Sequence, residues 1–249
     1  MSINDINNYL TQIKEISDYV YLHVLGEPLL HKEIDEVFNK CDELSLNVQL
    51  VTNGTLLKNH LNVLNHQSLR KLSISLHSIN NIDIKNDYFE TIKELINKEN
   101  NINIELRFYD FNNLDNDLNE FNKYLYANYD IKKTTKKNSF KLKDNVYIYY
   151  NKLFDWPNIN DSFISNIGYC HGGIDQIAIL NDGRVTLCCL DPLGHNTIGD
   201  LKKNSLKEIL DSNTYKDIIK NFKNRKINKE LCTKCSYRLR FDDMRNSKQ

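Results

Sequence analysis

Short apolar strands alternate with amphipathic helices through the first 150 residues, and this rhythm constrains the fold more than any other feature. Tyr19–Val24 and Val48–Val51 are short and mostly apolar runs, which is typical of strands in a sheet covered by helices. Strands and helices in this order form βα units with a parallel sheet, so the sequence predicts an α/β domain. The predicted strands are Tyr19–Val24, Val48–Val51, Lys71–Leu76, Ile102–Phe108 and Val146–Tyr150, and the predicted helices are 3–16, Glu33–Leu44, Leu57–Leu64, Tyr88–Ile96 and Leu114–Tyr126.

The pattern changes after about residue 165. Ile174–Leu180 and Arg184–Cys189 flank Asp182-Gly183, which is a strong signal for a β-hairpin with a two-residue turn. A helix is predicted over Leu206–Phe222. We therefore predict two domains, residues 1–160 and residues 165–245, the second a small cysteine-rich module of hairpin and helix.

Composition excludes several classes of protein. The chain of 249 residues carries 33 Lys and Arg against 33 Asp and Glu, and this balance argues against a nucleic-acid binder with a broad basic surface. Its apolar runs are far shorter than the roughly 20 residues that span a bilayer, and its first residues lack the features of a signal peptide, so we expect a cytoplasmic protein. A lysine-rich stretch, residues 132–143, is interpreted as a solvated loop rather than a phosphate-binding patch.

Five of the six cysteines fall in the second domain. Cys232-x-x-Cys235 has the spacing of a metal-binding turn, and Cys170 with one of Cys188 and Cys189 can supply two further thiolates. Neighbouring strand residues point to opposite faces, so only one of that adjacent pair is expected to ligate. Four thiolates suit a 4Fe–4S cluster or Zn²⁺, and buried cysteines without metal are the alternative. The sixth, Cys41, lies in an apolar helical stripe and is expected to be a buried free thiol.

Three segments of the first domain carry a resemblance to a known family: Leu25–His31 with its Gly-Glu-Pro, Val51–Leu57 with its Thr-Asn-Gly, and Ser73–Ser78. Together they resemble radical S-adenosylmethionine (SAM) enzymes. The cysteine-rich module is similar to the SPASM/twitch extension of that superfamily, as are Cys188-Cys189-Leu190-Asp191 and Ile198-Gly199-Asp200-Leu201. The resemblance implies a partial (β/α)6-type barrel and a reaction in which a 5′-deoxyadenosyl radical abstracts a hydrogen from a peptide or small metabolite.

The resemblance also implies cofactors and site residues. Gly26, Glu27 and Pro28 match the segment that contacts the SAM amino group, Ser75 matches a polar position that reaches SAM, and Asn53 and Arg107 end strands near the same site. A helix start at Glu27-Pro28 and a simple turn at Asn53-Gly54 are the competing interpretations. His23 and His77 are expected to be core or supporting residues, and His171 to make a loop hydrogen bond. One auxiliary 4Fe–4S cluster is expected on Cys170, Cys188, Cys232 and Cys235, with Cys189 in reserve for Cys188.

One defining element of the family is missing from these residues. Radical SAM enzymes hold their SAM-cleaving cluster with a C-x-x-x-C-x-x-C loop, and the sequence contains no such motif. We therefore expect a chain truncated at its N-terminus and inactive as given, with Val20–Leu25 as an uncovered sheet edge. The alternatives are a non-catalytic zinc or iron–sulfur protein with four cysteine ligands and a relic barrel, and an enzyme that borrows the missing cysteines from a partner.

Overall fold

The computed structural model describes residues 1–76, 85–99, 101–110, 113–136 and 138–246, and they form two compact units. The first comprises Ser17–Leu153, and we call it the sheet unit. The second combines Met1–Ile16 with Phe154–Gln249, and we call it the cysteine unit. No helix among the described residues is long and apolar enough to cross a membrane.

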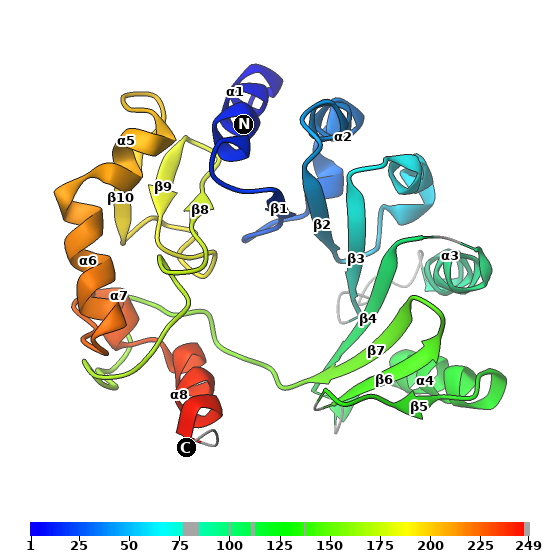
Figure 1. Ribbon diagram of the computed structural model, residues 1–249. Coiled ribbons are helices and arrows are strands. Elements are labelled where there is room, and N and C mark those ends of the chain that lie inside the picture. Colours follow the sequence, from blue (N-terminus) through cyan, green and yellow to red (C-terminus); the bar gives the residue numbers. More distant parts are fainter. Residues whose placement is uncertain (77–84, 100, 111–112, 137, 247–249) are drawn as a thin grey trace. The chain divides into compact units, whose positions relative to one another are not determined.

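The sheet unit is built on a seven-stranded sheet with the order β1-β2-β3-β4-β7-β6-β5 (Figure 1). The first five strands in that order are parallel to their neighbours, and β6 and β5 are antiparallel. The α/β class with a mostly parallel sheet is therefore confirmed. The strands are β1 (Tyr19–Leu22), β2 (Asn47–Thr52), β3 (Leu69–Ser75), β4 (Asn103–Tyr109), β5 (Lys132–Lys133), β6 (Ser139–Lys143) and β7 (Val146–Asn151).

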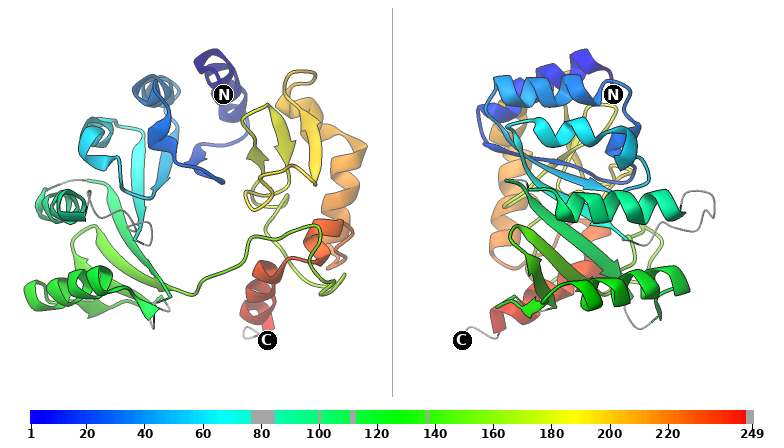
Figure 2. Two further views of the ribbon diagram at one scale, coloured as in Figure 1. Left: turned by 180° about the vertical axis from the view of Figure 1, so that it is seen from behind. Right: turned by 90° about the vertical axis from the view of Figure 1, so that its right-hand side faces the viewer.

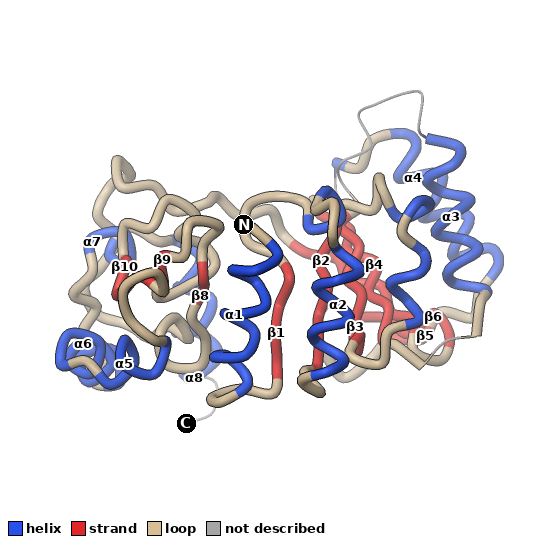
Figure 3. Tube along the Cα trace, turned by 90° about the horizontal axis from the view of Figure 1, so that it is seen from above, coloured by secondary structure: helices blue, strands red, loops and turns tan. Residues whose placement is uncertain are grey.

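Three helices, α2 (Ile34–Glu43), α3 (Lys85–Asn97) and α4 (Asn116–Asn128), cover one face of this sheet (Figures 2 and 3). Strand residues that point toward one face, such as Leu50 and Leu72, are fully buried. Because side chains alternate between the two faces of a strand, their neighbours along the chain lie on the opposite face. That opposite face carries the polar side chains Gln49, Ser73, Glu105 and Arg107 on neighbouring strands.

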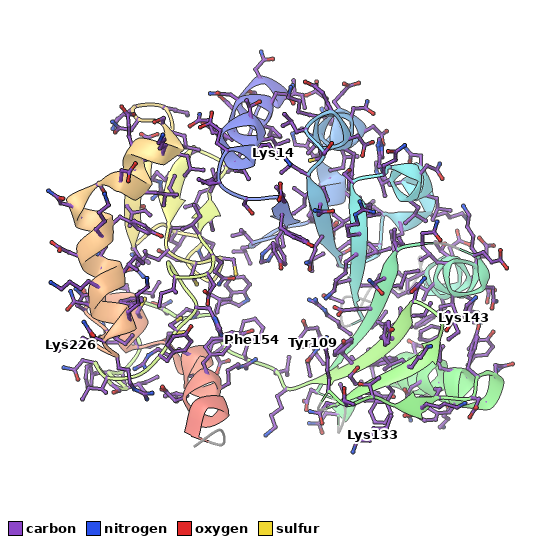
Figure 4. The ribbon with its side chains drawn as sticks, viewed as in Figure 1. Lys14, Tyr109, Lys133, Lys143, Phe154 and Lys226 are labelled. Carbon is purple, nitrogen blue, oxygen red and sulfur yellow. The ribbon has the colours of Figure 1, made fainter. Side chains whose placement is uncertain are left out.

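Three details of the sheet unit bear on the predictions. Among the described strands, β1 pairs only with β2 and so ends the sheet, as expected for an edge strand. The helix predicted over Leu57–Leu64 is wrong: the chain forms two 3-10 turns, η2 (Leu57–Asn59) and η3 (Leu61–Asn65). The lysine-rich stretch is not all loop either, since Lys133 and Lys143, labelled in Figure 4, belong to the hairpin strands β5 and β6.

The cysteine unit contains a three-stranded antiparallel sheet in the order β10-β9-β8. Its predicted hairpin is present, but Ile179 pairs with Val185, one residue out of register with a two-residue turn. The single helix predicted from Leu206 is interrupted at Ser212, which caps the second of two helices. The elements are α1 (Ile3–Lys14), β8 (Ala178–Ile179), β9 (Arg184–Thr186), β10 (Thr197–Asp200), α5 (Leu206–Asp211), α6 (Asn213–Lys223), α7 (Glu230–Thr233) and α8 (Leu239–Asn246).

The division of the chain differs from the predicted boundaries at residues 160 and 165, because α1 packs with the cysteine unit. Tyr9 of α1 shares an apolar cluster with Val185 of β9 and Leu206 of α5. The side chain of Gln12 accepts a hydrogen bond of 2.7 Å from the backbone N–H of Leu206. The first helix therefore completes the core of a module whose other residues follow the whole sheet unit in the chain.

Candidate SAM and iron–sulfur sites

Glu27 links the loop after β1 to the end of β2. Its carboxylate accepts hydrogen bonds from Thr52 Oγ1 at 2.8 Å, the Asn53 N–H at 2.7 Å and the Leu29 N–H at 3.0 Å. The last bond caps a 3-10 turn, η1 (Pro28–Leu30), so the competing interpretation of Glu27-Pro28 as a helix start is correct in local structure. The same contacts hold the Gly26–Pro28 segment at the carboxyl end of the sheet.

Backbone strain gathers in this loop. Val24 has a φ of 92° and Gly26 a φ of 143°. A positive φ is unusual for a β-branched residue, and such strain persists only where the surroundings impose it, often at functional sites. Two unusual conformations within three residues are consistent with a loop shaped to present its main chain to a ligand.

Asn53 forms a turn at the end of β2. Its side-chain oxygen accepts from the N–H of Thr55 at 2.9 Å, and its carbonyl accepts from the Tyr88 hydroxyl at 3.0 Å. Gly54 follows with a φ of +83°, and a Cβ there would lie 3.0 Å from Ile74 Cγ2. The simple-turn interpretation therefore describes the side chain of Asn53, whereas its backbone N–H is fixed by Glu27.

Ser75 and Arg107 are register partners at the ends of β3 and β4. Glu105 accepts from Arg107 Nη2 at 2.9 Å and from Ser73 Oγ at 3.0 Å, and it pairs with Lys71 Nζ at 2.6 Å. Burial disfavours the ionised form of Glu105, but the Lys71 hydrogen bond and the Arg107 charge outweigh it and keep the pKa of that carboxyl below its usual value. Lys71, Glu105 and Arg107 together carry one net positive charge on the polar face of the sheet.

The structure thus brings the predicted SAM residues to one edge of the sheet. Parallel strands end at a common edge, which is where open α/β sheets bind their ligands. Gly26, Glu27 and Pro28 follow β1, Asn53 follows β2, Ser75 ends β3 and Arg107 lies near the end of β4. Their roles toward SAM remain predictions.

Four thiols come together in the cysteine unit. Charge interactions link Cys170 with Cys188, Cys232 and Cys235. Gly172 lies between two of them, because a Cβ on this residue would be 3.1 Å from Cys188 Cβ and 3.5 Å from Cys170 Sγ. Each thiol belongs to a half-buried residue, and burial raises the pKa of Cys170 and Cys235 and raises that of Cys232 to about 12.

The structure bears on the choice between Cys188 and Cys189, the adjacent pair that follows β9. Cys188 interacts with Cys170, and its hydrogen bond to Cys189, together with burial, raises its pKa. Both cysteines lie beyond the end of β9 at Thr186, so strand alternation does not determine their directions. The position of Cys188 beside Cys170 and Gly172 agrees with the choice of Cys188 as the ligand, which stays a prediction.

Hydrogen-bond donors point at three of these sulfurs. The Gly172 N–H donates to Cys170 Sγ at 3.3 Å, the Leu190 N–H to Cys188 Sγ at 3.2 Å, and Asn196 Nδ2 to Cys232 Sγ at 3.2 Å. Cysteine sulfurs that accept hydrogen bonds from N–H groups are typical of iron–sulfur ligands. Within the described ranges, no three His, Cys, Asp or Glu side chains form a ready-made site for a single metal ion. The donor set and its N–H groups fit a cluster, in which each thiolate binds a different iron.

A buried arginine holds the main chain beside the four thiols, and it was not predicted from the sequence. Arg238 is 1% exposed, and its guanidinium donates to the carbonyls of Cys232 at 2.9 Å, Ser165 at 2.6 Å and Ile167 at 3.2 Å. Its positive charge favours the thiolate forms of Cys170, Cys232 and Cys235. A basic residue three positions after the C-x-x-C was the available signal.

The histidines and the remaining cysteine have different outcomes. His171 makes the predicted loop hydrogen bond, with Asp175 as its partner. His23 is exposed beyond the end of β1 and contacts the edge of the exposed Tyr21 ring, so it is not a core residue, and its supporting role stays a prediction. His77 lies outside the described residues. Cys41 is buried without a disulfide, as predicted, and burial raises its pKa to about 12.

Comparison with known proteins identifies the second module. Residues 170–236 match the SPASM family, described as an iron-sulfur cluster-binding domain, and this range begins at Cys170 and includes Cys188, Cys232 and Cys235. A curated relative, the GTP 3′,8-cyclase of Aquifex aeolicus (strain VF5), is 33% identical over 57 residues, which span 22% of this chain and 18% of that protein.

Solved structures identify the fold. BtrN in complex with AdoMet and 2-DOIA aligns with a TM-score of 0.58 at 15% identity, over 94% of this chain and 78% of that one. Histidine-tagged anSMEcpe with bound AdoMet aligns with a TM-score of 0.55 at 12% identity, over 88% and 71%. Both are radical SAM barrel proteins, so the chain has the radical SAM barrel fold followed by an iron–sulfur SPASM domain.

Proposed function

We propose that this chain carries the SAM-binding sheet and the auxiliary-cluster domain of a radical SAM enzyme that oxidises or modifies a peptide or small metabolite. The observation that supports this most strongly is the SPASM match, because it covers the four thiols that converge in the cysteine unit. In such an enzyme, SAM cleaved by reduction at a separate cluster would supply the radical that removes a hydrogen atom from the substrate.

In this proposal the sheet unit holds SAM at the carboxyl ends of β1 to β4. The main chain of Gly26–Pro28 and the carboxylate of Glu27 would bind the ammonium group, since anionic and carbonyl oxygens are its natural acceptors. Arg107, already oriented by Glu105, would face the carboxylate of SAM, and Ser75 beside it would donate or accept a hydrogen bond. The positive charge left over on this face favours an anionic group.

The cysteine unit would hold one auxiliary 4Fe–4S cluster through Cys170, Cys188, Cys232 and Cys235. Ligating thiols lose their protons on binding, and the positive charge of the irons would offset the cost of forming four thiolates whose pKa values are raised. Arg238 would offset part of the negative charge of the thiolates. Such a cluster would bind the substrate or accept an electron when the product is oxidised.

The missing C-x-x-x-C-x-x-C motif bears on activity. These 249 residues do not supply the three thiolates of a SAM-cleaving cluster, and we expect no reductive cleavage of SAM by this chain alone. The same feature favours a second candidate, a non-catalytic zinc or iron–sulfur protein with four cysteine ligands that keeps the barrel for interaction. Formation of 5′-deoxyadenosine by the reconstituted chain with SAM and dithionite would overturn the expectation of inactivity.

Isothermal titration of SAM into the protein tests the sheet-unit half of the proposal. Glu27→Gln weakens a charged acceptor and should raise the dissociation constant about tenfold or more, and Ser75→Ala should raise it by less. Glu36→Gln, on the exposed side of α2, is the matched control and should bind like the unmutated chain. Absence of SAM binding, or equal binding by Glu27→Gln and the control, would refute this site.

A further inference from the structure

The loop between β9 and β10 is organised by a buried carboxylate. Asp191 is 1% exposed and accepts hydrogen bonds from Thr186 Oγ1 at 2.8 Å, the His195 N–H at 2.9 Å and the Asn196 N–H at 2.6 Å. Buried carboxylates with this many internal donors hold a backbone in one conformation. The main chain of Asn196 is therefore fixed by Asp191, and its side chain has a defined direction.

That side chain points at a candidate cluster ligand. Asn196 is 5% exposed, and its Nδ2 donates to Cys232 Sγ at 3.2 Å. The donors at Cys170 and Cys188 are backbone N–H groups, whereas this one belongs to a side chain and can be changed by substitution. A metal-bound thiolate has only lone pairs to offer, so the amide nitrogen of Asn196 rather than its oxygen must face the sulfur.

We propose that Asn196 is a positioning residue that sets the reduction potential of the auxiliary cluster, with Asp191 holding it in place. This inference rests on the proposed cluster. A hydrogen bond to a ligating sulfur stabilises the more negative, reduced form and raises the potential. One side-chain amide would thus set how easily the cluster is reduced. The step in which the cluster accepts an electron from the substrate depends on that potential.

The test compares reduction potentials of the reconstituted protein and its variants. Asn196→Leu keeps a similar volume without a donor, and Asn196→Ser shortens the side chain so that it no longer reaches the sulfur. Both variants should keep the iron and sulfide content of the unmutated chain but show a midpoint potential shifted to more negative values in a titration followed by electron paramagnetic resonance. Asn221→Leu is the control, because the Asn221 side chain donates to Asp217 O within its own helix, and its potential should not move.

Each outcome has a definite meaning. An unchanged potential in both variants, or loss of the cluster from both, would overturn the assignment of Asn196 as a tuning residue while leaving the cluster in the unmutated chain intact. Failure of the unmutated chain to bind any iron–sulfur cluster would instead refute the proposed function, and this inference with it. The iron and sulfide content of the unmutated protein separates these two failures.

Discussion

The two units of this chain are stabilised in different ways. In the sheet unit, five parallel strands carry fully buried apolar side chains such as Leu50, Leu72 and Ile104 under a layer of helices. In the cysteine unit, the strands have two to four residues, and the polar buried groups include Arg238 and Asp191, with four half-buried thiols. Both units have an apolar core, but the core of the second consists of two small clusters beside the four thiols. A bound metal centre should therefore matter for the stability of the second unit alone.

The largest expected effect is the loss of the cluster when one of its thiolates is removed. Cys232→Ser should lower the iron bound after anaerobic reconstitution severalfold, because the other three thiolates cannot complete the ligand set. Cys41→Ala, which changes a buried cysteine of the sheet unit, should keep the full iron content, and so should Cys189→Ser. Equal iron in Cys232→Ser and Cys41→Ala would show that the thiols of the cysteine unit are not ligands.

Removal of the buried guanidinium should separate the stabilities of the two units. Arg238→Met removes a donor from the carbonyls of Ser165, Ile167 and Cys232, and it leaves Asp242 with Arg225 as its remaining guanidinium partner. We expect the free energy of unfolding of the cysteine unit to fall by about 3–5 kcal/mol. Amide hydrogen exchange should then quicken in the cysteine unit and stay unchanged in β2 to β4.

The control for that experiment is Arg240→Met, since Arg240 lies over the Tyr237 ring and makes a weaker cation–π contact. It should cost about 1 kcal/mol or less. Faster exchange in both units of Arg238→Met would contradict the separation of the two.

A smaller effect is expected at the turn after β2. Gly54→Ala places a side chain at a φ of +83° and within 3.0 Å of Ile74 Cγ2, so the sheet unit should lose about 1–3 kcal/mol. Gly26→Ala is the informative partner, because its φ is also positive but no atom lies within 4 Å of the new Cβ. Chemical denaturation should therefore show the larger loss for Gly54→Ala, and the reverse order would show that packing at β2 is looser than described.

The smallest effect concerns pH. The pKa of Glu105 is lower folded than unfolded, so the unfolded chain binds more protons and the ion pairs stabilise the fold fully above about pH 4.5. That contribution is lost as the pH falls through the folded pKa of Glu105. The stability difference between the unmutated chain and Glu105→Gln, measured in urea, should shrink from about pH 6 to about pH 3. A constant difference would show that the carboxylate is not held ionised by Lys71 and Arg107.

Prediction from sequence succeeded where hydrophobic burial decides the structure. The covered parallel strands carry apolar, buried side chains at every second position, so β2, β4 and β7 were located to within a residue or two. β5 and β6 were missed because a lysine-rich antiparallel edge lacks that signal. The one-residue register error in the hairpin arose because the turn was assumed to be as short as its Asp-Gly pair allows.

In the candidate sites, too, prediction from sequence found some residues and missed others. The cysteines and the Gly-Glu-Pro segment are visible as motifs, and their positions along the chain sufficed to group them. Asn196 and Arg238 were not singled out, because each acts through contacts made only in the folded module. Residues that orient others carry no local signature, so the structure was needed to find them.

The most direct test of the whole account is the metal content of the unmutated protein. After anaerobic reconstitution with iron, sulfide and zinc in competition, we predict about four irons and four sulfides per chain, with the visible absorption of a 4Fe–4S cluster. About one zinc per chain and no sulfide would contradict the account and favour a zinc protein with four cysteine ligands instead.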